Sequence, residues 1–316
     1  MEEERIQKLL ARAGYGSRRQ IERWIEKGAV MVNGKVATLG QKITDQSDVI
    51  LRGQKLRLST KLNAAPVVLL YHKQVGEICT RDDPEGRNTV FENLPEINPG
   101  RWISIGRLDI NTDGLILFTN DGALANKLMH PSSEIEREYA VRVLGEVSKD
   151  MLKTLQNGVM LEDGMASFDN IRFAGGEGAN QWYHVTLKEG RNREVRRLWE
   201  SQGVTVSRLR RVRFGSISLD RSLRAGQFEE LPIKRMMTLY ESVGLELVVP
   251  EGAEPAWKRK ENEKKGRGKK TGSWDSANKG NRRAGNDKSS YSKTKERGKK
   301  KGKSKSNNNS PWGDRG

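Results

Sequence analysis

The chain has 316 residues and a formal net charge of +17, and only 34% of its residues are hydrophobic. Its single cysteine, Cys79, excludes an internal disulfide and a cysteine-rich metal site. The sequence has no apolar run of about 18 residues and no signal-peptide pattern, so we expect a cytoplasmic protein without a membrane segment.

Residues 1–61 predict a small domain of two short helices and a hairpin. Ser17 and Gln20 have the spacing of a capping box, and Gly28 is a natural end for the helix that follows them. The pair Asn33-Gly34, between valine-rich runs, is typical of a two-residue type I′ turn. Arg19, Arg23 and Lys27 are spaced by four and are expected on the exposed side of the second helix. Together with Arg18 they are the candidate contacts to nucleic acid in this domain.

A basic helix beside a hairpin is suited to contact phosphates, although most charged helix faces are only solvated. The stretch RAGYGSRRQIERWIEKGAVMVNGKV resembles the small RNA-binding module known as the S-four domain. This resemblance implies recognition of structured RNA. The module occurs in proteins with and without enzymatic activity, so it indicates a ligand class and not a reaction.

Residues 62–250 predict a mixed α+β domain with a largely antiparallel sheet, after a linker at 59–66. Strands are expected at 67–71, 102–105, 115–119, 138–143, 182–187 and 204–214. Helices are expected at 122–129, 149–156, 192–201 and 233–243.

The first stretch that could carry chemistry is GRLDINTDGLILFTNDG, residues 106–122. Asp109 lies in a glycine-bounded turn, where a carboxylate can act as a nucleophile or a general base, and Arg107 is suited to contact RNA. On composition alone the simpler alternative is favoured, in which the residues from Asp109 to Gly114 form a tight turn between two strands. The motif therefore needs support from elsewhere in the chain.

Two later stretches supply that support. In EREYAVRV, Tyr139 shares one face of a strand with two valines, although most buried tyrosines are structural. Between residues 189 and 215 the chain has eight arginines against three glutamates, more than solubility explains, and the planar arginine fork suits phosphate recognition. The candidate RNA contacts there are Arg191, Arg193, Arg197, Arg208, Arg210 and Arg211.

Taken in order behind the S-four-like module, these three motifs resemble the RNA pseudouridine synthases of the ribosomal RNA type, over roughly residues 4 to 245. The resemblance implies that Asp109 is the essential aspartate and that Tyr139 is the active-site tyrosine. It implies that Arg196 pairs with the aspartate, that Leu198 forms an apolar wall, and that Arg107 takes the place of the extruded uridine.

The chain departs from the family pattern at KQVGEICT, where Gln74 replaces the usual proline. We expect a looser turn before Gly76 and assign no role to Lys73. The three histidines, His72, His130 and His184, lack ligand spacing, so no metal site is expected.

The implied reaction isomerises uridine to pseudouridine and needs no cofactor. The chain is most similar to the family members that act on the large ribosomal subunit, and this resemblance implies 23S rRNA as the partner. We expect the enzyme to be a monomer. Three alternatives stay open. The same reaction could act on 16S rRNA, or the chain could be a non-catalytic RNA-binding assembly factor. It could also be a hydrolase with paired carboxylates, either Asp109 with Asp113 or Asp82 with Asp83.

Residues 251–316 predict a disordered basic tail rich in Lys, Gly, Ser and Asn. From residue 258 onward it has 21 Lys and Arg against 6 Asp and Glu, a net +15, so the rest of the chain has only +2. Such a polycation favours a polyanion such as RNA through counterion release. The alternative is a solubilising tail without a specific partner.

Overall fold

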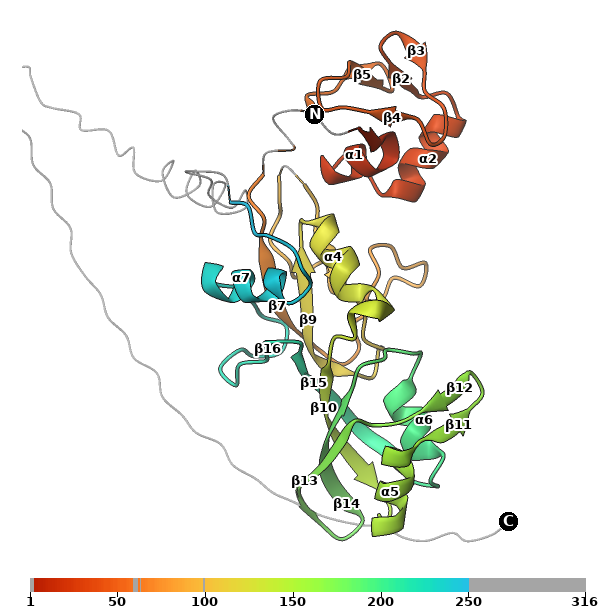
Figure 1. The fold of residues 1–316 in the computed structure, drawn as a ribbon, viewed down its shortest axis with the longest axis vertical. Coiled ribbons are helices and arrows are strands. Elements are labelled where there is room, and N and C mark those ends of the chain that lie inside the picture. The colour runs from red at the N-terminus through yellow and green to blue at the C-terminus, as the bar shows by residue number, and fades with distance from the viewer. Residues whose placement is uncertain (1–2, 59–61, 63, 99, 250–316) are drawn as a thin grey trace, which may run out of the picture. The chain divides into compact units, whose positions relative to one another are not determined.

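The computed structural model describes residues 3–58, 62, 64–98 and 100–249 (Figure 1). The predicted basic tail and part of the predicted linker lie outside these residues. Among the helices that are described, none is both long and apolar enough to span a membrane.

The N-terminal part folds as the sequence predicts. The helices are α1 (Ile6–Arg12) and α2 (Arg18–Glu26), and the strands are β1 (Glu4–Arg5), β2 (Val30–Val32), β3 (Lys35–Val36), β4 (Lys42–Ile43), β5 (Val49–Leu51) and β6 (Gln54–Lys55). Ser17 and Gln20 form the capping box at the start of α2. Asn33 and Gly34 both have positive φ, 49° and 79°, as a type I′ turn requires. A small core of its own includes Ile6, Leu10 and Ile21.

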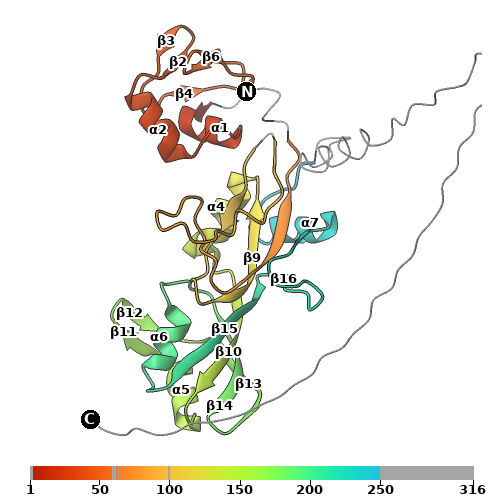
Figure 2. The same ribbon diagram turned by 180° about the vertical axis from the view of Figure 1, so that it is seen from behind.

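Residues 64–249 contain a nine-stranded sheet, which Figures 1 and 2 show from opposite sides. Its strands are β7 (Val68–Lys73), β8 (Ile103–Ile105), β9 (Asp113–Thr119), β10 (Arg137–Leu144), β13 (Asn170–Glu177), β14 (Asn180–Leu187), β15 (Thr205–Phe214), β16 (Ile217–Ser218) and β17 (Phe228–Glu230). The main order is β13-β14-β10-β15-β9-β7-β17, with β8 beside β9 and β16 beside β15. A short hairpin, β11 (Val159–Leu161) with β12 (Gly164–Ala166), is separate.

Four helices and one 3-10 turn accompany this sheet: α4 (Gly122–Met129), η1 (Pro131–Ser133), α5 (Lys149–Asn157), α6 (Glu194–Glu200) and α7 (Ile233–Glu241). Leu155 of α5 and Trp199 of α6 join the core formed by β10, β14 and β15. Leu124 of α4 and Leu239 of α7 join a second core against β7 and β9. Both cores are apolar, so the burial of these side chains against the sheet holds α5 and α6 on β10, β14 and β15 and holds α4 and α7 on β7 and β9.

The predicted α+β class with a largely antiparallel sheet is confirmed, since the named strands pair antiparallel apart from β9 with β15. The six predicted strands and four predicted helices all form, with ends within two residues of the expected ones. Strand β13 was missed because it is a mostly exposed edge strand that includes Gly175 and Gly176 and so lacks apolar alternation. The β11–β12 hairpin and the short strand β17 were also missed.

Candidate active site

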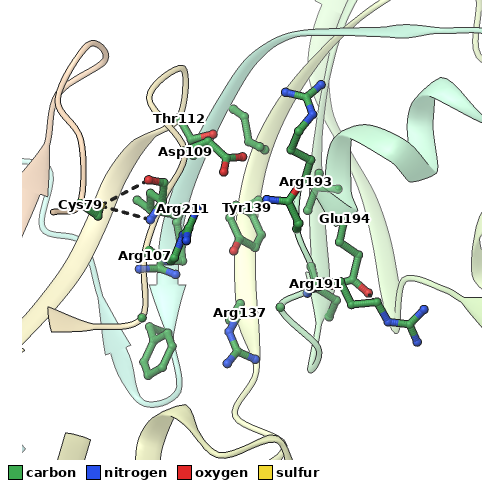
Figure 3. Close-up of a pocket in the computed structure, with 18 of the residues that line it drawn as sticks. Cys79, Arg107, Asp109, Thr112, Arg137, Tyr139, Arg191, Arg193, Glu194 and Arg211 are labelled. Carbon is green, nitrogen blue, oxygen red and sulfur yellow. Dashed lines mark hydrogen bonds and ion pairs between the residues drawn. The ribbon is translucent and has the colours of Figure 1, made fainter. Parts of the chain in front are cut away.

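The residues singled out from the sequence converge on one pocket of about 580 Å³ (Figure 3). Six of the predicted functional side chains line it: Arg107, Asp109, Tyr139, Arg191, Arg193 and Arg211. They come from the β8–β9 loop, from β10, from the segment before α6 and from β15. Segments far apart in the sequence therefore build a single cavity.

Asp109 lies in the loop between β8 and β9, and the loop is tightly fixed. The backbone N–H of Thr112 donates to the carbonyl of Asp109 at 3.0 Å, which closes the turn. The thiol of Cys79 donates to the carbonyl of Leu108 at 3.3 Å, and the N–H of Leu108 donates back to the sulfur at 3.4 Å. The Asp109 carboxylate itself makes no hydrogen bond or ion pair with any described residue, so its oxygens are open to a ligand.

Lys73 binds the Asp109 loop through hydrogen bonds to its carbonyls. Its side chain is fully buried, and its ammonium donates to the carbonyls of Gln74 and Thr112, both at 2.9 Å, and of Ile110 at 3.5 Å. Burial lowers the pKa of Lys73, and the charges of nearby groups, Asp109 among them, partly offset that effect. A buried ammonium that binds the carbonyls of two loops holds them together.

The turn at Gln74 is held by two hydrogen bonds. The N–H of Gln74, which a proline would lack, donates to the Glu77 carboxylate at 3.0 Å. The N–H of Gly76 donates to the carbonyl of Ile110 at 2.9 Å, so the turn is attached to the Asp109 loop. Lys73, which ends the apolar run VVLLYHK, was the signal in the sequence for this attachment of the Asp109 loop, and we had assigned it no role.

Tyr139 lies on β10 as predicted, with its side chain on the buried face that Val141 and Val143 share. The residue is only 8% exposed, and it is directly opposite Arg211 of β15 and Val185 of β14. Its hydroxyl makes no hydrogen bond with a described residue, although buried phenols usually find a partner. Figure 3 shows the Asp109 carboxylate directed toward the strand that carries Tyr139.

Arg196 differs from the role that the resemblance implies. It makes no ion pair with Asp109, although both residues are described; its two terminal nitrogens donate instead to the carbonyls of Val206 and Asn111, each at 2.9 Å. Burial lowers its pKa, and the charge of Asp109 acts in the opposite direction. Arg196 therefore holds the Asp109 loop through Asn111 and does not line the pocket.

The apolar wall also differs. Leu198 is fully buried in the core, whereas Leu209 of β15 lines the pocket. Helical spacing correctly places Leu198 on the buried face of α6, but of the apolar residues on that face Val195, and not Leu198, lines the pocket.

The other predicted RNA contacts fall into two groups. Arg18, Arg19 and Arg23 of α2 and Lys27, which caps its C-terminal end, are exposed without ion-pair partners in the described chain. The arginines of the later segment are more constrained. Arg191 contacts Glu189 at 2.5 Å, Arg193 contacts Glu200 at 3.3 Å, Arg197 contacts Asp163 at 2.8 Å, Arg208 is exposed, Arg210 contacts Asp113 at 2.8 Å, and Arg211 is buried.

These contacts weaken the paired-carboxylate alternative. Both oxygens of Asp113 accept from Arg210, at 3.0 and 2.8 Å, and Asp83 is bound in the same bidentate way by Arg87. Glu194 is the other carboxylate lining the pocket; it is buried, burial raises its pKa, and it accepts from the N–H of Arg191 at 3.0 Å. Across the described residues, no group of three or more His, Cys, Asp or Glu is placed to hold a metal ion.

Residues 67–201 match the family described as RNA pseudouridylate synthase, and residues 4–50 match the S4 domain. A protein of Haemophilus influenzae is 58% identical over 246 residues, which are 77% of this chain and 69% of that protein. The chain therefore belongs to the RNA pseudouridine synthase family.

That relative is named ribosomal large subunit pseudouridine synthase B. The same name belongs to a Pseudomonas aeruginosa protein that is 56% identical over 250 residues, 79% of this chain. The match spans 65% of the length of the Pseudomonas protein. A crystal structure described as pseudouridylate synthase covers 74% of this chain and 99% of its own, with a TM-score of 0.53 and 24% identity, which supports the fold.

Proposed function

We propose that this chain is a ribosomal RNA pseudouridine synthase that converts one uridine of the large-subunit, 23S rRNA to pseudouridine. The observation that carries the proposal is the Asp109 carboxylate, which has no partner among the described residues and shares a pocket with Tyr139 and Arg107. The names of the relatives support the large subunit as the source of the RNA. The same reaction on 16S rRNA is the alternative.

The proposed reaction moves a glycosidic bond without loss of atoms or electrons. The C1′–N1 bond breaks, and its electron pair leaves with the uracil. Asp109 either attacks C1′ to form an ester or removes the proton from C2′ to give a glycal. The base then turns and its C5 bonds to C1′, which releases the Asp109 carboxylate in the ester route or returns its proton to C2′ in the glycal route. Tyr139 assists removal of the C5 proton, and N1 of the base takes up a proton in exchange; a positioned acid or base of this kind is worth about 10² to 10⁴ in rate.

The target uridine must leave its stack to reach the pocket, which costs a few kcal/mol and favours loop or single-stranded sites. Arg107 is exposed at the pocket, in the loop that carries Asp109. Its guanidinium is suited to stack or hydrogen-bond in the gap that the uridine leaves. The basic side chains of α2 would add contacts to the RNA backbone that position the enzyme without reading sequence.

Replacement of Asp109 by Asn tests the proposal. The amide keeps the size of the side chain but removes the nucleophile or base, so we expect conversion to be abolished while RNA affinity changes less than about twofold. Asp150→Asn is the control, since the Asp150 side chain is 91% exposed on α5. Conversion is measured by carbodiimide mapping of a 23S rRNA fragment, and normal turnover by Asp109→Asn would remove Asp109 from the mechanism.

The same assay separates the alternatives. Absence of any isomerised base with the unaltered protein would favour the RNA-binding assembly factor. Release of free uracil would favour the hydrolase, whose paired carboxylates need a set separation. A monomeric state, a cytoplasmic location and the domain limits 1–61, 62–250 and 251–316 stay predictions.

A further inference from the structure

Arg211 lines the pocket, and its terminal nitrogens make no hydrogen bond to any described residue. The residue lies on β15 and is 2% exposed. Its Nε donates to the carbonyl of Leu115 at 2.7 Å, and this is the one hydrogen bond that its guanidinium makes to described residues. The buried Nη2 has no partner. Figure 3 shows the guanidinium beside Arg107, between the Cys79 side of the pocket and the strand of Tyr139.

The backbone at Arg211 is held on both sides. It is opposite Tyr139 of β10 in one direction and Gly114 of β9 in the other. Gly114 has a φ of 108°, and a Cβ there would collide with the backbone of Arg211, so only glycine permits this close approach. Because β15 is paired on both sides at Arg211, the backbone that carries the guanidinium is fixed by two neighbouring strands.

A buried cation without a carboxylate is costly unless a ligand completes it. No ion pair reaches Arg211 from the described residues, and its guanidinium carbon lies 5.3 Å from the centroid of the Phe214 ring. An unpaired buried polar group costs about 1–3 kcal/mol and a charged one more. The hydroxyl of Thr112, which also lines the pocket, is likewise buried without a partner. The two groups together indicate that the pocket is completed by a ligand rich in hydrogen-bond acceptors.

The proposed reaction creates such an acceptor at the moment of bond cleavage. When C1′–N1 breaks, the electron pair stays with the uracil and its charge spreads over N1, O2 and O4. A fixed cationic donor in an enclosed site binds this anion more strongly than it binds the neutral base. An interaction that strengthens toward the transition state raises kcat, whereas equal binding of both states does not.

We propose that Arg211 is a catalytic residue that donates from its terminal nitrogens to a carbonyl oxygen of the target uracil and stabilises the departing uracil anion. The inference rests on the proposed function, because it needs a uridine in this pocket. It gives Arg211 a role separate from those of Asp109, which acts on the sugar, and Tyr139, which assists removal of the C5 proton.

The test compares Arg211→Met and Arg211→Lys with Arg221→Met, an exposed arginine that does not line the pocket. Single-turnover consumption of the target nucleoside in a 23S rRNA stem-loop is measured with uridine and with 5-fluorouridine at the target, by chromatography of the nucleosides in nuclease digests. Consumption is the readout because 5-fluorouridine has no C5 proton to lose and cannot complete the last step, although its C1′–N1 bond still breaks. Loss of one donor to a developing anion typically costs about 10² to 10³ in kcat. We expect that loss on uridine for Arg211→Met, with RNA affinity within about threefold of the unaltered protein.

The fluorinated substrate distinguishes catalysis from structure. Fluorine withdraws electrons and stabilises the uracil anion, so its departure depends less on Arg211. The ratio of the 5-fluorouridine rate to the uridine rate should therefore rise at least about tenfold in the Arg211 variants and stay unchanged in Arg221→Met. An unchanged ratio in a folded Arg211 variant would overturn the inference.

Folding is checked by thermal denaturation. Arg211→Lys keeps a cation at this position and supplies a second variant if Arg211→Met fails to fold. Unfolding of both variants would assign Arg211 to the fold and would also overturn the inference. Absence of conversion by the unaltered protein would instead contradict the proposed function, so the two failures are distinguishable.

Discussion

Lys73 offers a direct test of how the fold holds the Asp109 loop. In Lys73→Met the volume is nearly kept, but the carbonyls of Gln74 and Thr112 lose a charged donor at 2.9 Å. Hydrogen bonds to charged groups contribute about 1.5–3 kcal/mol each, and removal of the buried charge returns part of its desolvation cost. We therefore expect the free energy of unfolding to fall by about 2–4 kcal/mol.

For a domain of this size, 1 kcal/mol shifts Tm by about 2–4 °C, so Tm should fall by roughly 4–16 °C. At a temperature where the variant is folded, kcat should fall about 10- to 100-fold because the Asp109 loop is less well positioned, while RNA affinity changes little. Calorimetry and single-turnover conversion measure the two effects. The control is Lys153→Met, since the Lys153 side chain is 73% exposed on α5. A variant with the Tm and kcat of the unaltered protein would refute the argument.

Three further predictions follow from single contacts or charges. Burial raises the pKa of Glu194, so its contribution to stability is present at low pH and lost as the pH rises through the folded pKa. Glu194→Gln should therefore have a higher Tm than the unaltered protein at pH 8 but not at pH 5. If thermal melts show the same difference in Tm between the two proteins at both pH values, the result would argue against the burial effect. Gln74→Pro should lower the free energy of unfolding by about 1–3 kcal/mol, measured by urea denaturation, because the Glu77 carboxylate loses the hydrogen bond that the N–H of Gln74 donates. An increase in stability would contradict this. Removal of residues 258–316, which have a net +15, should weaken RNA binding and flatten its salt dependence without a change in the modified uridine; a shifted site in carbodiimide mapping would contradict this.

Much of the fold could be predicted because its signals are local. The capping box at Ser17 and the Asn33-Gly34 turn depend on residues a few positions apart, and the structure has both. The parallel pairing of β9 with β15 could not be predicted, since it joins Asp113 to Arg210 across nearly a hundred residues. Strand β13 could not be predicted for a different reason, because edge strands need no apolar alternation.

The candidate site was predictable in part of its membership, since Arg196 and Leu198 do not line the pocket, and not in its contacts. Ordered motifs identified Asp109 and Tyr139, and both line the pocket. Whether Arg196 reaches a carboxylate or a carbonyl depends on where the loop of Asn111 ends, which no spacing encodes. Arg211 was predicted as an RNA contact from charge alone, and its burial depends on the register of β15 against β10.

The arginine-rich segment shows why charge overstates the contact with RNA. Of its eight arginines, Arg196 and Arg211 are buried and bonded to carbonyls, and Arg208 is exposed without an ion pair in the described chain. The other five have carboxylate partners: Arg191, Arg193, Arg197, Arg210 and Arg213. Partly exposed ion pairs contribute about 0–1 kcal/mol, so an RNA phosphate can replace a carboxylate at small cost. The two buried arginines cannot reach a phosphate at the surface, which leaves six arginines for contact with RNA. In a plot of the logarithm of the binding constant against the logarithm of the salt concentration, this segment therefore contributes a slope of at most roughly 4 to 5 in magnitude.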